Sequence, residues 1–384
     1  MNILFFISSP FTPNEGGVQK STSKLAQVFS NNGHSCTILS LSNSGITSWE
    51  NMPIVHLKGI VSDDDKMQFR KNLDKFKIDL VINQMGSELD ITSFIVKNKI
   101  NSVKVINTLR MNPMSFVQNA EFVIKEKLKA KNLSLLYSSF LKDTIIRYHR
   151  RKQKKILDYI LNSVDFYVTL SQAFIPELRF FGIDVDIYQS KLVAIPNMFP
   201  PIQNYNSQKK NVVLFVGRLE IAQKRIDLLQ IIWKDLHKLL PSWEFWVVGD
   251  GPERANFEGF CKRNALNRVK FFGFDEPNKY YAQAKILSFT SANEGFGNVL
   301  IEAQQYGVVP VMFNSYSAAP DLVKNGKTGD LVVPFDTDAF VQKTISLANQ
   351  TEDWQKASQA AKLHAKRFEY LEISKKWENL LKSI

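Results

Sequence analysis

Glu294 and Glu302 lie eight residues apart in the segment whose pattern is most typical of a chemical site, residues 288–303. An apolar run leads into Glu-Gly-Phe-Gly, and an apolar stretch with helical spacing then carries the second glutamate. In a helix the two carboxylates are about 80° apart, so both can face one side. Burying a carboxylate beside Leu300 and Ile301 is costly unless it accepts hydrogen bonds, and sugar hydroxyls are suitable donors.

The turn between the glutamates contains four residues that can present backbone N–H groups to a ligand: Gly295, Phe296, Gly297 and Asn298. The first N–H groups of a helix have no partner within the helix and bind phosphate or sugar oxygens. A purely structural interpretation also exists, in which Glu294 offsets the helix dipole and Glu302 forms a salt bridge in the core.

Two cations follow another apolar run, residues 212–216, which predicts a strand. The run ends in Gly217 and Arg218, and Lys224 comes six residues later at the start of a predicted helix. The arginine fork matches phosphate oxygens, and the lysine adds a compact charge. Two solvated surface cations are the alternative. Since parallel sheets bind ligands where strands end, we favour phosphate binding.

Gly16 and Gly17 form a third candidate site, between a predicted strand at residues 3–7 and a predicted helix at 18–32. Such a pair lets the backbone approach a diphosphate closely, although a flexible turn would use it equally well. It matches neither the G-x-G-x-x-G of dinucleotide-binding enzymes nor the phosphate loop of NTPases, and neither pattern occurs elsewhere in the sequence.

The elements that must position these residues alternate along the chain. We predict strands at residues 3–7, 35–41, 80–83, 103–107, 166–169 and 192–195, and then at 212–216, 243–248, 269–272, 286–290, 308–313 and 329–333. Helical spacing between them predicts parallel pairing through right-handed crossovers. A proline-rich linker at 196–208 divides the chain. We therefore expect two Rossmann-like α/β domains, 1–200 and 208–368, facing across a cleft, with a C-terminal helix at 369–384 packing back on the first.

Positive charge is concentrated in the first half. The 384 residues carry a net charge of +12, and residues 121–160 contain 11 basic and 4 acidic side chains. Apolar residues interleave with these cations, which favours a basic amphipathic helix suited to an anionic membrane surface or a polyphosphate. A solvated helix face is the plain alternative. Because no helix-turn-helix, zinc-finger or RNP-like pattern occurs, we do not expect nucleic acid as a partner.

The composition excludes a secreted miniprotein, a collagen and an integral membrane protein. The chain is 44% hydrophobic, which suits globular cores, and contains only two cysteines, Cys36 and Cys261. They form neither a disulfide framework nor a paired metal-binding motif, so a reducing compartment is expected. We expect no secretory leader and no membrane-spanning helix. The predicted location is therefore the cytoplasm, with peripheral binding to the inner membrane face.

These loops, in this order, resemble the retaining glycosyltransferases of family four, which have the GT-B fold. The resemblance covers essentially the whole chain and is clearest over residues 212–333. Glu294 and Glu302 fit the Glu-x7-Glu motif of that family, and Arg218 and Lys224 fit its phosphate-binding cations. The glycine pair near the N-terminus fits its glycine loop.

The resemblance implies roles for these residues. Glu302 would bind the ribose hydroxyls of a nucleotide-diphosphate sugar and Glu294 the transferred sugar. Arg218 and Lys224 would neutralise the diphosphate, so these two and Glu294 are the expected catalytic residues. The base would lie near Phe274. The expected donor-binding residues are Gly17, Gly217, Glu294, Gly295, Phe296, Gly297, Asn298, Glu302 and Phe274.

Arg110 departs from the family pattern. After the strand predicted at 103–107 the family usually has a histidine that faces the donor sugar, and here Arg110 stands near that position. Either the register differs or the protein uses a cation there, for example to hold an acceptor phosphate. Arg110 and Gly16 are the first-domain candidates.

The resemblance implies retaining, metal-independent transfer of a hexosyl or N-acetylhexosaminyl group, with UDP favoured over GDP in the donor. The acceptor would be a saccharide, linked to a lipid pyrophosphate, in surface polysaccharide or glycan biosynthesis. The nucleotide sugar is a co-substrate, and we expect no further cofactor. The alternative is a sugar-nucleotide epimerase of the same fold, which would consume the donor without an acceptor. A second alternative is a catalytically inactive member of the family, because Arg110 stands near the usual position of the histidine.

Overall fold

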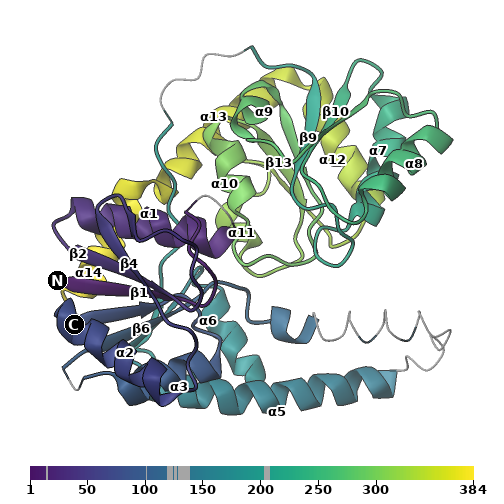
Figure 1. Cartoon of the computed structure of the whole chain (residues 1–384). Coiled ribbons are helices and arrows are strands. Elements are labelled where there is room, and N and C mark those ends of the chain that lie inside the picture. The colour runs from purple at the N-terminus through teal and green to yellow at the C-terminus, as the bar shows by residue number, and fades with distance from the viewer. Residues whose placement is uncertain (14–15, 101, 119–123, 125–127, 129–138, 203–207) are drawn as a thin grey trace. The chain divides into compact units, whose positions relative to one another are not determined.

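The computed structural model describes the chain except for residues 14–15, 101, 119–123, 125–127, 129–138 and 203–207. The chain divides into two compact units. Unit 1 contains Met1–Met198 and Tyr370–Ile384, and unit 2 contains Phe199–Glu369. Each unit has one sheet flanked by helices (Figure 1). Each therefore has its own core and its own ligand-binding edge.

Unit 1 contains an eight-stranded sheet in the order β3-β4-β2-β1-β5-β6-β7-β8. The strands are β1 (Asn2–Ile7), β2 (Ser35–Ser40), β3 (Ser48–Trp49), β4 (Met52–His56), β5 (Leu80–Asn83), β6 (Lys104–Leu109), β7 (Phe166–Thr169) and β8 (Leu192–Ala194). Neighbours are parallel except β3 and β4, a short antiparallel pair that the sequence did not predict. The order reverses between β1 and β5, and parallel sheets bind ligands at the carboxyl ends of strands at such a reversal.

Helices cover both faces of this sheet. They are α1 (Gly17–Asn31), α2 (Asp63–Lys75), α3 (Leu89–Asn98), α5 (Ser139–Ser163), α6 (Phe174–Glu177) with the 3-10 turn η2 (Leu178–Phe181), and α14 (Tyr370–Leu381). The side chains of β1 alternate between two cores, since Leu4 and Phe6 pack with α2 and α3 whereas Phe5 packs with α1 and α14. On that second face Phe29 of α1 contacts Trp377 of α14, with ring centroids 5.8 Å apart. The C-terminal helix therefore completes the core of unit 1.

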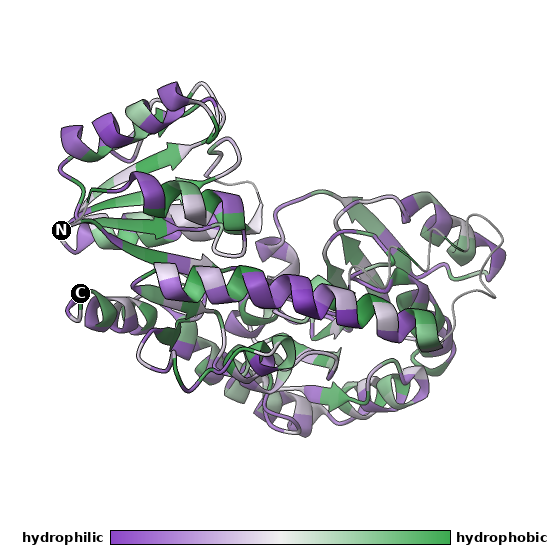
Figure 2. Cartoon of the chain, turned by 90° about the horizontal axis from the view of Figure 1, so that it is seen from below, coloured by the Kyte–Doolittle hydropathy of each residue, from purple (hydrophilic) through white to green (hydrophobic). Residues whose placement is uncertain are grey.

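The helix α5 carries the described part of the basic segment. Its C-terminal half buries Leu157, Ile160 and Leu161 in the core, whereas Arg147 and Arg151 are exposed. In Figure 2, which views the chain from below, much of the ribbon of α5 has the colour of hydrophilic residues. Most of residues 121–138, also predicted as basic helix, lies outside the described residues. Over the part of the chain that the structure describes, none of the helices has the length and apolarity needed to cross a bilayer.

Unit 2 contains a six-stranded parallel sheet in the order β11-β10-β9-β12-β13-β14. The strands are β9 (Val212–Val216), β10 (Glu244–Val248), β11 (Val269–Gly273), β12 (Ile286–Phe289), β13 (Val309–Phe313) and β14 (Asp330–Val332). The chain builds outward from β9 through β10 to β11 and then crosses to β12 on the other side of β9. In sheets of this kind the ligand-binding crevice is found at the carboxyl ends of the strands where the order reverses, which are β9 and β12 here.

The helices of unit 2 are α7 (Ile226–Leu239), α8 (Arg254–Arg263), α9 (Asn278–Gln283), α10 (Asn298–Gln305), α11 (Ala319–Leu322), α12 (Thr337–Asn349) and α13 (Thr351–Ala365), followed by the 3-10 turn η3 (Lys366–Phe368). Helices α7 and α12 pack on the sheet through apolar side chains, with Trp233 of α7 stacked on Phe245 of β10 at a centroid distance of 4.9 Å. Strands buried on both faces are typical of such sheets.

Two glycines at the carboxyl ends of β9 and β10 let these strands run close together. Gly249 has φ +128°, and a Cβ built there would lie 2.0 Å from the carbonyl oxygen of Gly217. The Gly217 N–H donates to the carbonyl of Val248 at 3.0 Å. Only glycine fits at position 249, because a side chain would force apart the two loops that follow these strands.

We predict that Gly249→Ala lowers the free energy of unfolding by about 2–5 kcal/mol, because backbone strain and steric overlap add. Chemical denaturation of the full chain measures this change. The matched control is Gly326→Ala, since Gly326 has φ +68° but open space around its Cβ position. It should cost only about 1–2 kcal/mol. Equal losses in both variants would show that close approach of the loops does not matter.

Candidate functional site

The predicted site residues of unit 2 lie at the carboxyl edge of its sheet. The segment 217–224 follows β9, and the segment 290–298 follows β12. Since β9 and β12 are neighbours at the point where the strand order reverses, these two segments lie where parallel sheets bind ligands.

Lys224 and Glu294 form an ion pair that joins these two segments. The Lys224 Nζ donates a short hydrogen bond to Glu294 Oε1, and Gln223 Nε2 donates to Glu294 Oε2 at 3.2 Å. The side chains of Lys224 and Glu294 are only 14% and 9% exposed. The Lys224 Nζ also lies 5.6 Å from the ring centroid of Phe289. The family resemblance implies separate roles for these two residues, whereas the structure pairs them.

Backbone contacts hold the two partners in place. The Thr290 hydroxyl donates to the carbonyl of Lys224 at 2.7 Å, and the Ala292 N–H donates to the carbonyl of Gln223 at 2.7 Å. Arg225 then adopts φ 52° before α7, with its guanidinium paired to Asp227 at 2.8 Å. These hydrogen bonds connect the loop after β12 to the loop after β9. They hold Lys224 and Glu294 close to each other.

Glu302 lies in the second turn of α10, where it is half-buried. The Tyr281 hydroxyl donates to Glu302 Oε2 at 3.2 Å. Burial and the charge of Glu302 raise the pKa of Tyr281 well above its usual range, so this hydroxyl stays protonated and keeps donating. Tyr281 therefore orients the carboxylate.

The turn before α10 is built around Gly297. Its φ is +92°, and a Cβ there would lie 2.8 Å from the hydroxyl of Tyr316, which follows β13. That hydroxyl is buried, and no partner for it occurs among the described residues. Burial, together with the charge of Glu294, raises the pKa of Tyr316 well above its usual range. Tyr316 is thus an unused donor beside the turn.

Tyr316 is a candidate that the sequence analysis missed. It belongs to none of the motifs that mark the other loops, and the only available signal was its place three residues after a buried strand. The Phe296 side chain, by contrast, packs against Phe368 at a centroid distance of 5.8 Å. Any ligand contact of Phe296 must therefore come from its backbone.

Two other predicted residues of unit 2 lie at the same edge with exposed side chains. Arg218 is 68% exposed, and its Nε lies 3.7 Å from Glu220 Oε2. Phe274 follows β11 and is 91% exposed. An exposed ring and an exposed guanidinium at a ligand-binding edge are both available for a nucleotide.

The unit 1 candidates lie at the carboxyl edge of the other sheet. Gly16 is the N-cap of α1 and has φ 70°, and α1 begins at Gly17 without a side-chain cap. Arg110 follows β6, and its guanidinium donates to Gln84 and Asn197. No described group of three or more His, Cys, Asp or Glu residues is arranged to hold a metal ion.

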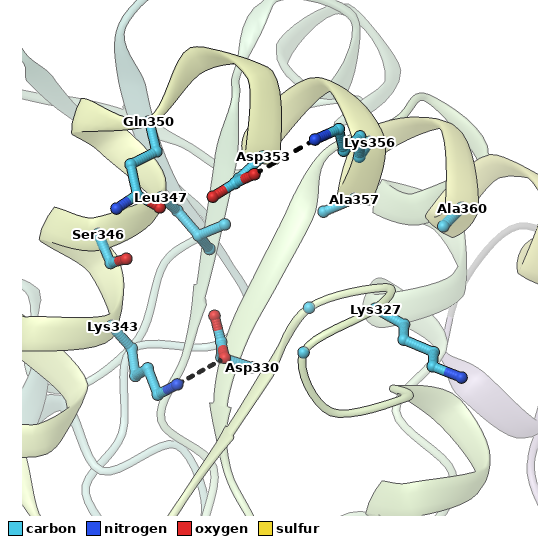
Figure 3. Close-up of a pocket in the computed structure, with 12 residues that line it drawn as sticks. Lys327, Asp330, Lys343, Ser346, Leu347, Gln350, Asp353, Lys356, Ala357 and Ala360 are labelled. Carbon is cyan, nitrogen blue, oxygen red and sulfur yellow. Dashed lines mark ion pairs between the residues drawn. The ribbon is translucent and has the colours of Figure 1, made fainter.

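Unit 2 also contains a cavity of about 580 Å³, and it lies at the opposite edge of the sheet (Figure 3). Its lining residues come from the loop before β14, the first residue of β14, and the segment from Lys343 of α12 to Ala360 of α13. Two of its lysines are already paired, Lys343 with Asp330 at 3.2 Å and Lys356 with Asp353 at 3.7 Å. Since parallel sheets bind ligands at the carboxyl edge, this cavity is separate from the candidate site.

Comparisons with known proteins concern the family and the fold of the chain. Residues 201–364 match the family described as glycosyl transferases group 1. Over 198 residues the chain is 31% identical to the GalNAc-α-(1→4)-GalNAc-α-(1→3)-diNAcBac-PP-undecaprenol α-1,4-N-acetyl-D-galactosaminyltransferase of Campylobacter jejuni, covering 50% of this chain and 55% of that protein. It is 27% identical over 187 residues to the lipopolysaccharide 1,6-galactosyltransferase of Salmonella typhimurium, covering 46% and 50%.

Among solved structures, Anabaena HepE in complex with UDP and glucose matches with a TM-score of 0.74 and 17% identity, covering 100% of both chains. At that identity the likeness concerns the fold alone. The aligned part of the chain spans about half the length of the curated relatives named above.

We predict strong energetic coupling between Lys224 and Glu294. Removing one partner of a buried ion pair leaves the other charge uncompensated, so Lys224→Met or Glu294→Gln should each destabilise unit 2 by about 3 kcal/mol. The double variant should be more stable than the sum of these losses implies, by at least about 1 kcal/mol. Urea denaturation of the four proteins gives the coupling.

The exposed pair of Lys154 and Asp158 in α5, at 2.8 Å, is the control for this cycle. Its coupling should stay below about 0.5 kcal/mol because solvent screens exposed pairs. Strict additivity at positions 224 and 294 would contradict the coupling that we expect.

Proposed function

Since the chain belongs to the group 1 glycosyltransferases, the retaining enzymes of family four with the GT-B fold, we propose that it transfers a hexosyl or N-acetylhexosaminyl group from a nucleotide-diphosphate sugar to a saccharide acceptor. The observation that carries this proposal is the buried pair of Lys224 and Glu294 at the crevice of unit 2. A cation and a carboxylate fixed side by side suit a ligand that has both phosphate oxygens and hydroxyl groups.

In the proposed complex, each group of unit 2 binds one part of the donor. Lys224 retains two N–H donors after its bond to Glu294, and with the exposed Arg218 it would neutralise the diphosphate. The N–H groups of the turn before α10 would add donors. Glu302, oriented by Tyr281, would accept hydrogen bonds from the ribose hydroxyls, and the exposed ring of Phe274 would lie against the base.

The proposed rate enhancement comes from fixed positive charge. When the bond between the sugar and the diphosphate breaks, negative charge grows on the leaving oxygens and the sugar becomes oxocarbenium-like. Lys224 and Arg218 bind that growing charge more strongly than the ground state, which lowers the barrier. The acceptor hydroxyl would attack from the face of the departing diphosphate, which takes its proton, so the anomeric configuration is retained. These steps require no metal ion.

The proposed acceptor is a saccharide attached to a lipid through pyrophosphate, in surface polysaccharide or glycan biosynthesis. The relatives named above support this choice, since one acts on an undecaprenol-linked saccharide and another on lipopolysaccharide. The UDP in the Anabaena HepE complex supports UDP over GDP as the nucleotide. A lipid-linked acceptor requires the enzyme to work at a membrane, and we propose the cytoplasmic face.

The outer surface of α5 supports this membrane proposal. Arg147, Arg151 and Lys155 follow one another at four-residue intervals and are all exposed. Phe140 and Tyr148 on the same helix are 80% and 62% exposed. Cations beside exposed aromatic rings are typical of a helix that lies on an anionic lipid surface.

We predict that Glu302→Gln and Lys224→Met each lower the turnover number by about 10²–10³. Lys224→Met removes a fixed positive charge from the departing diphosphate, and Glu302→Gln weakens the hydrogen-bond acceptor that positions the donor. Formation of the glycosylated product from a lipid-linked acceptor measures this, at a temperature where circular dichroism shows a folded chain. Lys343→Met, in the cavity at the opposite edge, is the control and should keep full turnover. Unchanged turnover in both site variants would refute the proposed site.

A thermal-shift screen identifies the donor. The matching UDP-, GDP- or ADP-sugar should stabilise the chain by about 2.7 kcal/mol at a hundred times its dissociation constant, and we expect a UDP-sugar to give the largest shift. Donor consumption without a glycosylated product would favour the epimerase alternative. No shift with any nucleotide sugar would exclude the transferase.

We predict that the triple variant Arg147→Glu, Arg151→Glu and Lys155→Glu no longer floats with vesicles that contain anionic lipid, because each reversed cation removes about 1 kcal/mol of attraction or more. Vesicle flotation measures the bound fraction. The matched control reverses three exposed cations of unit 2, namely Lys238, Lys262 and Arg263. Equal flotation of the α5 variant and the wild type would refute the membrane surface.

A further inference from the structure

Arg110 is a cation whose described partners are all neutral. Its Nε donates to Gln84 Oε1 at 2.7 Å and its Nη1 to Asn197 Oδ1 at 2.9 Å. Among the residues that the structure describes, no carboxylate lies within ion-pair distance of it. Burial lowers the pKa of Arg110 to about 10, so the side chain stays charged at neutral pH. A charge in such a place is costly without a counter-ion.

The hydrogen bonds of Gln84 determine which way its side-chain amide points. Its Oε1 accepts from both Arg110 Nε and the Thr108 hydroxyl, the latter at 3.0 Å. Because the Arg110 Nε–H can only donate, the amide oxygen must face it and the NH2 group must point elsewhere. Gln84 is only 1% exposed, and within the described residues its Nε2 has no partner. A buried amide with two unused N–H groups is rare, since such groups are almost always paired.

The polar groups beneath this pair are by contrast satisfied. Asn83 Nδ2 donates to Asn107 Oδ1 at 3.1 Å, and Asn107 Nδ2 donates to the Thr92 hydroxyl at 2.8 Å. The polar side chains that lack a suitable partner therefore lie just after β5 and β6 end. They are Gln84 and Arg110. That edge adjoins the reversal between β1 and β5, where this sheet binds ligands. The side chain of Arg110 is partly exposed there, so a ligand can reach it.

We propose that Arg110 and Gln84 form an anion-binding site of unit 1, which takes phosphate oxygens. A guanidinium edge and an amide NH2 group supply only donors, which suits an oxyanion and not a hydroxyl that must also donate. Resting on the proposed function, we assign the anion to the pyrophosphate of the lipid-linked acceptor, because Arg218 and Lys224 of unit 2 are available for the donor diphosphate. Arg110 is thereby a binding residue for the acceptor.

Titration of the full chain with inorganic pyrophosphate tests the site directly. With UDP present at saturation, so that the diphosphate site of unit 2 is filled, Arg110→Gln should weaken pyrophosphate binding about 10- to 100-fold, the usual effect of losing a charge-assisted hydrogen bond. Arg179→Gln is the control, because Arg179 is an exposed arginine of unit 1 that is paired with Asp186. Unchanged affinity in Arg110→Gln overturns the proposal.

Gln84→Glu gives a second test, which stays informative even if the chain does not fold without Arg110. A carboxylate at position 84 would supply the missing counter-ion, so the variant should melt at a higher temperature than the wild type and bind pyrophosphate at least 10-fold more weakly. Wild-type affinity with an unchanged melting temperature would show that Arg110 does not lack a counter-ion, which overturns the proposal.

Steady-state kinetics identify the source of the phosphate. Arg110→Gln should raise KM for a lipid-pyrophosphate acceptor about 10-fold or more and leave KM for the donor unchanged, and Arg110→Lys should recover part of the loss. An increase confined to the donor KM overturns the assignment to the acceptor. If the wild type transfers no sugar and does not bind UDP, the proposed function fails. Loss of one pyrophosphate site in Arg110→Gln would then still support the anion site, and retention of all sites would refute it.

Discussion

The contact between Lys224 and Glu294 is the constraint on which the candidate site depends. Two charges with little exposure to water are tolerated only if they stay together, so the loops after β9 and β12 must keep a fixed relation. The sheet supplies that relation, since the two strands are neighbours. The same contact positions the Lys224 cation near the start of α10. Without it, the diphosphate of the proposed donor would have to be neutralised by mobile side chains.

Much of this arrangement could be predicted from the sequence. Apolar runs that alternate with helical spacing identify parallel sheets, and in such sheets ligands bind at the carboxyl edge, so Lys224 and Glu294 could be assigned to one edge without coordinates. The short antiparallel pair of β3 and β4 was missed, since β3 has only two residues and β4 contains Pro53, a residue that argues against a strand inside a sheet. Contacts between residues far apart in the sequence could not be predicted either, because spacing along the chain does not show which donor bonds to which acceptor.

Tyr316 and Gln84 illustrate what the sequence cannot provide. Each is an ordinary polar residue after a strand, and each becomes a candidate only because the fold buries it without giving one of its polar atoms a partner among the described residues. That property depends on the completed packing around the residue. Conversely, the aromatic ring of Phe296 is conspicuous in the sequence, yet it is buried against Phe368 and serves the core.

The two units treat their cations differently, and the difference has a physical consequence. In unit 2 a carboxylate already balances Lys224, so an incoming phosphate shares the lysine and gains less from it, but the site is stable when empty. In unit 1 the described partners of Arg110 are amide oxygens, so its charge is unbalanced and an anion would gain the full interaction. Unit 1 is therefore less stable without its ligand, and an anion there would be held by Coulombic attraction that the empty fold leaves unused. Under the proposed function, selection between the donor diphosphate and the acceptor pyrophosphate would follow from which cation is already neutralised.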